Sequence, residues 1–173
     1  MPAGPGRVSR RPLRLSAAAL LLAAGTLATA AAAQDPLCPR WRQAFASMPV
    51  QMVTVESKGR TIAVRVRVAR AGEQRAAGFQ CATREEIERS LILFDFGEEI
   101  HTQFHMQNVP AALDIAFAKA DGRIFAILRM DPSPTALYGP LGGFRYALEA
   151  RAGFYESQGL RQGEARLVIP PAR

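Results

Sequence analysis

Two acidic residues stand inside apolar stretches and are the first candidates for chemistry. Asp114 lies within the run Leu113–Phe117, and Glu149 follows a Tyr-Ala-Leu stretch. A buried carboxylate is costly unless it has partners. The two groups could flank a sugar as general acid and base, or bind a polar ligand, together with Asn108 or His105. Both roles stay open here, because the distance between the carboxyl groups depends on the fold.

Asp114 also has a structural explanation, which applies equally to Glu149. A carboxylate within a strand can accept hydrogen bonds from backbone N–H groups or pair with an arginine, and this chain is rich in arginine. Side chains of a strand alternate between its two faces. We therefore expect Asp114 to share a face with Ala116 and Ala118, and we favour the structural role for it.

The two histidines, His101 and His105, do not predict a metal site. On a strand, a spacing of four residues separates them by about 13 Å, which is too far for one ion. No cysteine or carboxylate completes a ligand set by its spacing. The sequence also has no Gly-x-Ser-x-Gly elbow and no phosphate-binding loop, so we expect neither a metal nor a cofactor.

Two cysteines, Cys38 and Cys81, predict a single disulfide. Disulfides persist in exported proteins, and two cysteines leave one intramolecular pairing. The bond would fasten the proline-rich segment around Cys38 to the domain. The alternative is two free thiols, with Cys81 as a small residue of the core.

Residues 1–33 are typical of a signal peptide. A basic stretch over Arg7–Arg14 leads into an apolar run that starts at Leu15, and Ala31–Ala33 supplies small residues before a cut at Gln34. This pattern predicts a periplasmic or secreted protein, without a membrane span after cleavage.

Two alternatives concern the same segment. Ser9–Leu13 resembles a twin-arginine signal, but arginine pairs are common in basic leaders, so we favour Sec export. Leu15–Ala33 is also an uncharged run that could remain as an anchor, although its second half is mostly alanine and threonine, which partition poorly into lipid.

The formal charge of +7 is concentrated at the N-terminus, since residues 1–33 hold four arginines and no acid. Residues 34–173 hold 18 basic and 15 acidic groups, a net charge of +3. Nucleic-acid binders usually carry a surface dominated by basic residues. The balance therefore argues against a nucleic-acid partner.

The rest of the chain predicts short strands separated by turns. The four residues Ser57–Arg60 predict a hairpin, as does Asp121-Gly122, and Thr83 with Glu86 forms a capping-box pattern. Short helices are expected at 72–78, 83–89 and 153–158, and a loop at 131–143. Eight strands are expected, at residues 51–56, 61–69, 91–96, 102–106, 113–119, 123–130, 144–150 and 164–169.

These elements predict a mostly β (α+β) domain, with about eight short strands in a small barrel-like or curled sheet and two or three short helices. The expected organisation is a signal peptide over residues 1–33, an irregular segment over 34–50 and one β domain over 51–173. Prolines interrupt the irregular segment, in which residues 41–48 could form one or two helical turns.

Several blocks occur in an order that points to one family: Gly78-Phe79, Phe104–Phe117, Asp121–Ile124 and Leu148–Gly153. This order resembles the DUF192 family of small bacterial and archaeal proteins, many of which carry signal peptides. The resemblance extends over about Ile62–Ile169. It implies a compact, mostly β domain and brings no established activity.

The leading functional hypothesis is a non-enzymatic exported domain that binds a small polar or saccharide ligand, or an envelope protein. His105, Asn108, Asp114 and Glu149 are its candidate ligand-binding residues. The alternative is a hydrolase-like enzyme that uses Asp114 and Glu149. A third possibility, an accessory subunit of a larger envelope complex, would show an apolar surface patch around Phe144, Tyr146 and Phe154.

Overall fold

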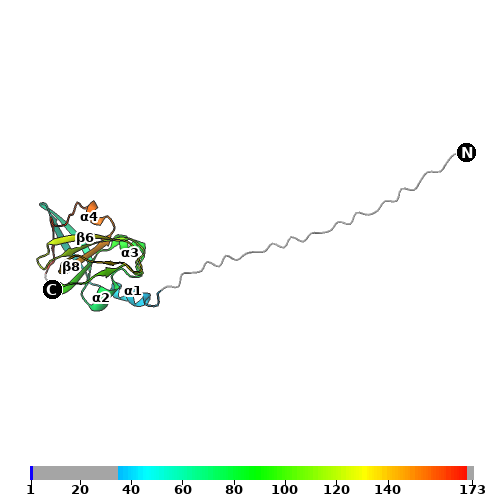
Figure 1. The fold of residues 1–173 in the computed structure, drawn as a ribbon, viewed down its shortest axis with the longest axis horizontal. Helices are drawn as coiled ribbons and strands as arrows, with labels where there is room; N and C mark the ends of the chain where they lie inside the picture. The colour runs from blue at the N-terminus through cyan, green and yellow to red at the C-terminus, as the bar shows by residue number, and fades with distance from the viewer. Residues whose placement is uncertain (2–34, 171–173) are drawn as a thin grey trace. The chain divides into compact units, whose positions relative to one another are not determined.

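The computed structural model describes Met1 and residues 35–170 (Figure 1). The predicted signal peptide and its cut before Gln34 therefore lie outside the described residues, apart from Met1. Residues 35–170 build the fold, which is mostly β as the sequence predicts.

The first two strands, β1 (Val50–Ser57) and β2 (Arg60–Ala69), form the predicted hairpin. Lys58 and Gly59 connect them with φ angles of 48° and 74°. Two positive φ angles are what a two-residue hairpin turn needs to match the twist of its strands. The alternating valines of both strands then point into the core.

Seven strands form one sheet in the order β6-β5-β8-β3-β2-β1-β9. Neighbouring strands in this sheet run antiparallel, except β2 and β3, which run parallel. The sheet curls into a half-barrel, and an isolated bridge between Arg123 and Arg166 joins its two edges at one end. Its remaining strands are β3 (Ile92–Ile100), β5 (Leu113–Ala118), β6 (Ile124–Met130), β8 (Phe144–Arg151) and β9 (Ala165–Val168).

Two very short strands, β4 (Phe104–His105) and β7 (Leu137–Tyr138), form a separate pair. The predicted strand over 102–106 is thus shorter than expected. The expected loop over 131–143 contains β7, which raises the number of strands in the described residues from the predicted eight to nine.

Residues 35–170 also contain four short helices: α1 (Cys38–Ser47), α2 (Gly72–Ala77), α3 (Arg84–Arg89) and α4 (Phe154–Ser157). The predicted capping box opens α3, with Thr83 and Glu86 each accepting a hydrogen bond from the backbone N–H of the other. Within residues 35–170, no helix has the length and apolar character to cross a membrane.

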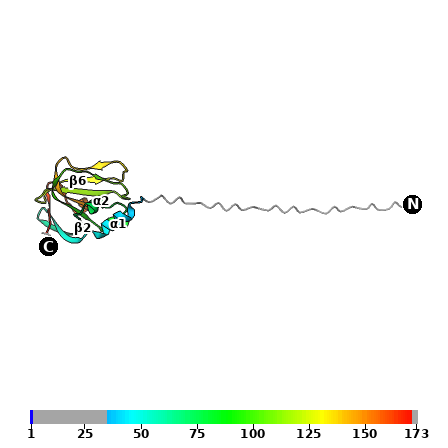
Figure 2. The same ribbon diagram turned by 90° about the horizontal axis from the view of Figure 1, so that it is seen from below.

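The segment over 34–50 contains α1, which is longer than the one or two helical turns expected over 41–48. Pro39 occupies the first turn of this helix, where a proline costs no hydrogen bond, rather than interrupting it. The helix lies beside α2 (Figure 2) and buries Ala44 and Phe45. Packing against the domain therefore stabilises a helix that local sequence alone does not favour.

Strand β5 separates two hydrophobic clusters. Leu113, Ile115 and Phe117 belong to one cluster, and Ala116 and Ala118 belong to the other. The alternation predicted for this strand is confirmed. The sheet is therefore buried on both faces here, and the direction of each side chain decides which cluster it joins.

Candidate functional site

Glu149 lies in the interior of β8 with apolar residues on both sides. In the register of the sheet, it is paired with Ile92 of β3 and with Ile115 of β5. Only 4% of the residue is exposed, and its Oε2 accepts no hydrogen bond from the described part of the chain. Burial raises the pKa of Glu149 to about 8. The side chain is therefore mostly a neutral carboxylic acid at pH 7.

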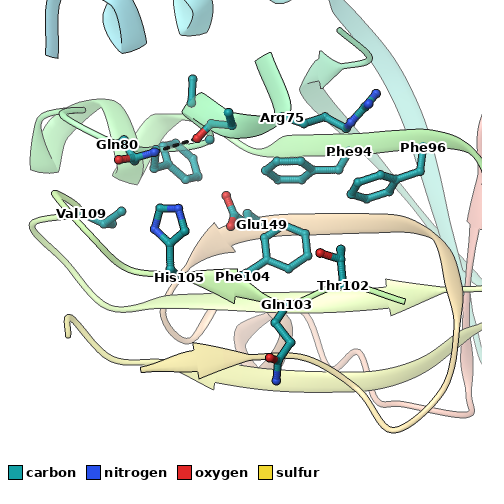
Figure 3. Close-up of a pocket in the computed structure, with 14 residues that line it drawn as sticks. Arg75, Gln80, Phe94, Phe96, Thr102, Gln103, Phe104, His105, Val109 and Glu149 are labelled. Carbon is teal, nitrogen blue, oxygen red and sulfur yellow. Dashed lines mark hydrogen bonds between the residues drawn. The ribbon is translucent and has the colours of Figure 1, made fainter. Parts of the chain in front are cut away.

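A cavity of about 250 Å³ opens beside this carboxyl group. Four phenylalanines contribute to its wall: Phe79, Phe94, Phe96 and Phe104. The rings of the last three form one cluster, with Phe94 and Phe104 in an edge-to-face contact at 5.1 Å between ring centroids. Figure 3 shows Glu149 in the middle of the group, with His105 on one side and Phe94 and Phe96 on the other. We call this cavity the Glu149 pocket.

Gly78 lies between the pocket and the carboxyl group of Glu149 without filling the space there. This residue ends α2 with a φ of 46°, a conformation that glycine adopts without strain. A Cβ atom here would lie 3.5 Å from Cζ of Phe94 and 3.6 Å from Oε2 of Glu149. A larger side chain would therefore occupy the space directly beside the unpartnered oxygen.

Polar residues also reach the pocket, and two of them have defined hydrogen bonds. Gln80 donates from Nε2 to the carbonyl of Ala76 at 2.7 Å. His105 accepts at Nδ1 from the N–H of Gln107 at 3.3 Å, so the proton of its neutral ring belongs on Nε2. Nε2 of His105 is then a hydrogen-bond donor at the rim.

Asp114 does not belong to this pocket. Its carboxylate forms an ion pair with Arg129 and accepts a hydrogen bond from the backbone N–H of Gly153 at 2.7 Å. Both contacts belong to the structural role that the sequence favours. Because Ile115 faces Glu149, the preceding residue Asp114 points to the opposite side of the sheet.

Asn108 lies next to the pocket without lining it. It occupies a turn with a φ of 56°, a conformation that asparagine tolerates better than most residues. Its carbonyl accepts from the N–H of Cys81 at 2.8 Å, and its Nδ2 donates to Asp35 at 2.8 Å. The next residue, Val109, does line the pocket.

The predicted disulfide between Cys38 and Cys81 is confirmed, with 5.5 Å between the two Cα atoms. It links the first residue of α1 to the residue that follows Gln80. The covalent bond therefore fixes α1 against one wall of the Glu149 pocket.

The candidate residues are thus only partly brought together. Glu149 and His105 line one pocket, Asn108 supports the adjacent turn, and Asp114 lies on the other face. Sequence reasoning missed Gly78 and the aromatic wall. The alternation of Phe94 and Phe96 along one strand was a usable signal for the wall, since it places both rings on one face.

Two further expectations concern an apolar surface patch and a metal site. Of the three residues expected to build an apolar surface patch, Phe144 is fully buried beside Phe117, so it cannot contribute. Tyr146 and Phe154 are partly buried against the core. In the part of the chain that the structure describes, no group of three or more His, Cys, Asp or Glu side chains could hold a metal ion.

Comparison with known proteins bears on the family and the fold. The model of the DUF192 family, described as an uncharacterized ACR, matches residues 53–167. A solved structure from Sinorhizobium meliloti 1021, described as a proposed transcription regulator, is 30% identical with a TM-score of 0.64, over 70% of this chain and 94% of that chain. No curated protein matches the chain at a significant level.

A second solved structure is a protein of unknown function from Novosphingobium aromaticivorans DSM 12444. It is 21% identical to this chain, with a TM-score of 0.63, and the match covers 82% of this chain and 94% of that chain. At this identity the similarity shows a shared fold alone.

Proposed function

This chain belongs to the DUF192 family, and we propose that it is an exported, non-enzymatic domain that binds a small polar ligand of the saccharide type in the Glu149 pocket. The observation that carries the proposal is the carboxyl group of Glu149, which is buried, faces the cavity and has an unpartnered oxygen. A ligand would supply the missing hydrogen bonds.

Leaving the oxygen of Glu149 without a hydrogen-bond partner costs free energy. A buried polar atom without a partner costs about 1–3 kcal/mol, and most such atoms in proteins are satisfied. Ligand sites are concave and mostly apolar, with a few polar groups that fix the orientation of the ligand. The aromatic wall with Glu149 and His105 has this composition.

The hydrolase alternative loses its chemical basis. Glycosidases that use two carboxyl groups place them on either side of one bond. Asp114 and Glu149 face opposite sides of the sheet, and Asp114 is already occupied by Arg129 and Gly153. A single buried acid fits a binding role better than this two-carboxylate reaction.

Export is part of the proposal and rests on the leader-like pattern of residues 1–33. An exported domain would meet saccharides and polyols of the cell envelope. The description of the Sinorhizobium protein as a transcription regulator is not part of the proposal. Residues 34–173 carry a net charge of only +3, which argues against binding to nucleic acid.

Titration with small sugars and polyols, followed by two-dimensional NMR of the protein, tests the proposal. We expect saturable shifts confined to residues around the pocket, such as Gly78, Phe104 and Val109. The absence of pocket shifts with every compound would contradict a small-ligand site.

Two matched tryptophan variants locate the binding. His105→Trp places a large ring at the rim and should abolish the shifts. Leu141→Trp makes a similar change at a fully exposed position that does not line the pocket, and it should leave binding unchanged. Equal effects of the two variants would place the ligand elsewhere.

A further inference from the structure

Two arginines near Glu149, one lining the pocket and one further along β8, contact other groups. Arg75 lines the pocket, but its guanidinium donates to the carbonyl of Arg70 and lies 5.3 Å from the ring centroid of Phe96. Arg151, two residues after Glu149 on the same face of β8, forms an ion pair with Glu88 at 3.5 Å. In Figure 3 the side chain of Arg75 points away from Glu149, and Arg151 does not line the pocket. Neither guanidinium therefore lies beside the carboxyl group of Glu149.

The titratable groups behind Glu149 belong to the other face of the sheet. Asp114 is paired with Arg129, and the hydroxyl of Tyr155 donates to the carbonyl of Leu148 at 2.6 Å. On the pocket side, His105 at the rim is the other titratable group beside Arg75. The interior of the pocket therefore contains aromatic rings and neutral polar groups.

A protonated carboxyl group has one O–H donor and an acceptor oxygen, and a ligand hydroxyl can satisfy both. An ammonium group would instead require an ionised carboxylate between Ile92 and Ile115, in a pocket that Arg75 also lines. A ligand carboxylate beside Glu149 would require a cation at that position, and the side chain of Arg75 points away from it. An uncharged ligand with hydroxyl groups meets neither obstacle.

We infer from this distribution of charge that the ligand is an uncharged, polyhydroxylated ring of about monosaccharide size. The inference rests on the proposed function. One hydroxyl group of the ligand exchanges hydrogen bonds with the protonated carboxyl of Glu149, and the ring lies against the wall of Phe94 and Phe104. The cavity of about 250 Å³ has room for one such ring. Amino sugars and uronic acids are rejected.

Matched sugars test the inference because they differ in one substituent. Glucose and galactose are compared with glucosamine and galactosamine, and with glucuronate and galacturonate, by NMR titration of the purified protein at pH 6.5. We expect at least one neutral sugar to bind at the pocket, with dissociation constants at least tenfold weaker for its charged relatives.

The pH dependence gives an independent readout. The affinity for the neutral sugar should be constant below about pH 8 and fall about tenfold per pH unit above it, as Glu149 loses its proton. Glu149→Gln keeps a neutral donor and acceptor, so it should still bind at pH 9.5. Glu156→Gln, an exposed control on α4, should follow the wild type.

The outcomes separate this inference from the proposed function. Tighter binding of an amino sugar or uronic acid at the pocket would overturn the uncharged class and leave the ligand site in place. Binding of a neutral sugar that Glu149→Gln does not rescue at pH 9.5 would overturn the role of the protonated carboxyl. No pocket shift with any of the six sugars would overturn this inference, and no shift with the polyols as well would overturn the proposed function.

Discussion

Asp114 and Glu149 lie on neighbouring strands one residue out of register, so their carboxyl groups face opposite sides of the same sheet. Asp114 is paired with Ala150, and Ile115 is paired with Glu149. One carboxylate is held by Arg129 and the N–H of Gly153, while the other has an unpartnered oxygen facing a cavity. Two residues of the same chemistry thus have different roles because their surroundings differ.

Replacing Asp114 should destabilise the protein. In Asp114→Ala, the N–H of Gly153 and the guanidinium of Arg129 lose their acceptor, and we expect a loss of about 1–3 kcal/mol in the free energy of unfolding, measured with urea. Asp131→Ala removes a carboxylate at an exposed position and should change stability by less than about 0.5 kcal/mol. Equal stability of both variants would contradict the structural role.

Glu149 should make stability fall as pH rises. Its pKa is about 8 in the folded protein and about 4.3 in an unfolded chain, so the folded state holds the extra proton between these values. The free energy of unfolding should therefore decrease between pH 5 and 8, by up to about 1.4 kcal/mol per pH unit. Glu149→Gln should remove this decrease. Parallel curves for wild type and variant would contradict the buried acid.

Glu86 provides a control of opposite sign. Partial burial opposes ionisation, but hydrogen bonds from the Thr83 N–H and from Arg42 outweigh it and lower the pKa of Glu86. A lowered pKa stabilises the fold above the unfolded value, and this contribution is lost as the pH falls through the folded value. Glu86→Gln should therefore cost stability at pH 7 and converge with the wild type in acid.

Local chemistry made much of the fold predictable. The turn at Lys58-Gly59, the capping box at Thr83 and the disulfide each follow from residue types at short spacing or from elimination. The sequence predicts only one or two helical turns over 41–48, because prolines interrupt the segment. The packing of Phe45 against the domain, which stabilises the longer helix α1, is not visible in local sequence.

The candidate site was less predictable because it is assembled from distant segments. Gly78, Phe94, Phe104 and Glu149 come from the end of α2 and from three different strands. Sequence alternation assigned Asp114 to one face of its own strand. The face of Glu149 relative to Asp114 depends on the register between β5 and β8, which only tertiary structure fixes.

Gly122 should not tolerate a side chain. Its φ is 84°, and a Cβ atom would lie 2.0 Å from the carbonyl oxygen of Leu167, whose N–H donates to the Gly122 carbonyl at 2.8 Å. Gly122→Ala should cost at least about 2 kcal/mol in unfolding free energy. Gly59→Ala has a similar φ of 74° but no neighbour within 4 Å, so it should cost only about 1 kcal/mol. Equal costs would show that backbone strain alone matters.

The predicted signal peptide, residues 1–33, should be absent from the exported protein. If cleavage follows Ala33, the intact mass measured after secretion should equal that of Gln34–Arg173, with a further loss of one ammonia if Gln34 cyclises. A variant with large residues at Ala31 and Ala33 should accumulate uncleaved, because signal peptidase requires small side chains there. A membrane-bound species that retains residues 1–33 would favour the anchor instead.

The disulfide should stabilise the whole domain and hold α1 in place. Cys38 and Cys81 are 43 residues apart, and closing a loop of that length stabilises a protein by about 4 kcal/mol in the chain-entropy model. We expect the double variant Cys38→Ser, Cys81→Ser to lose stability of this order, with hydrogen exchange increasing first in α1. Thiol titration of the denatured, unreduced wild type should find no free thiol. Two reactive thiols, or a double variant as stable as the wild type, would show that packing of Phe45 alone holds the helix.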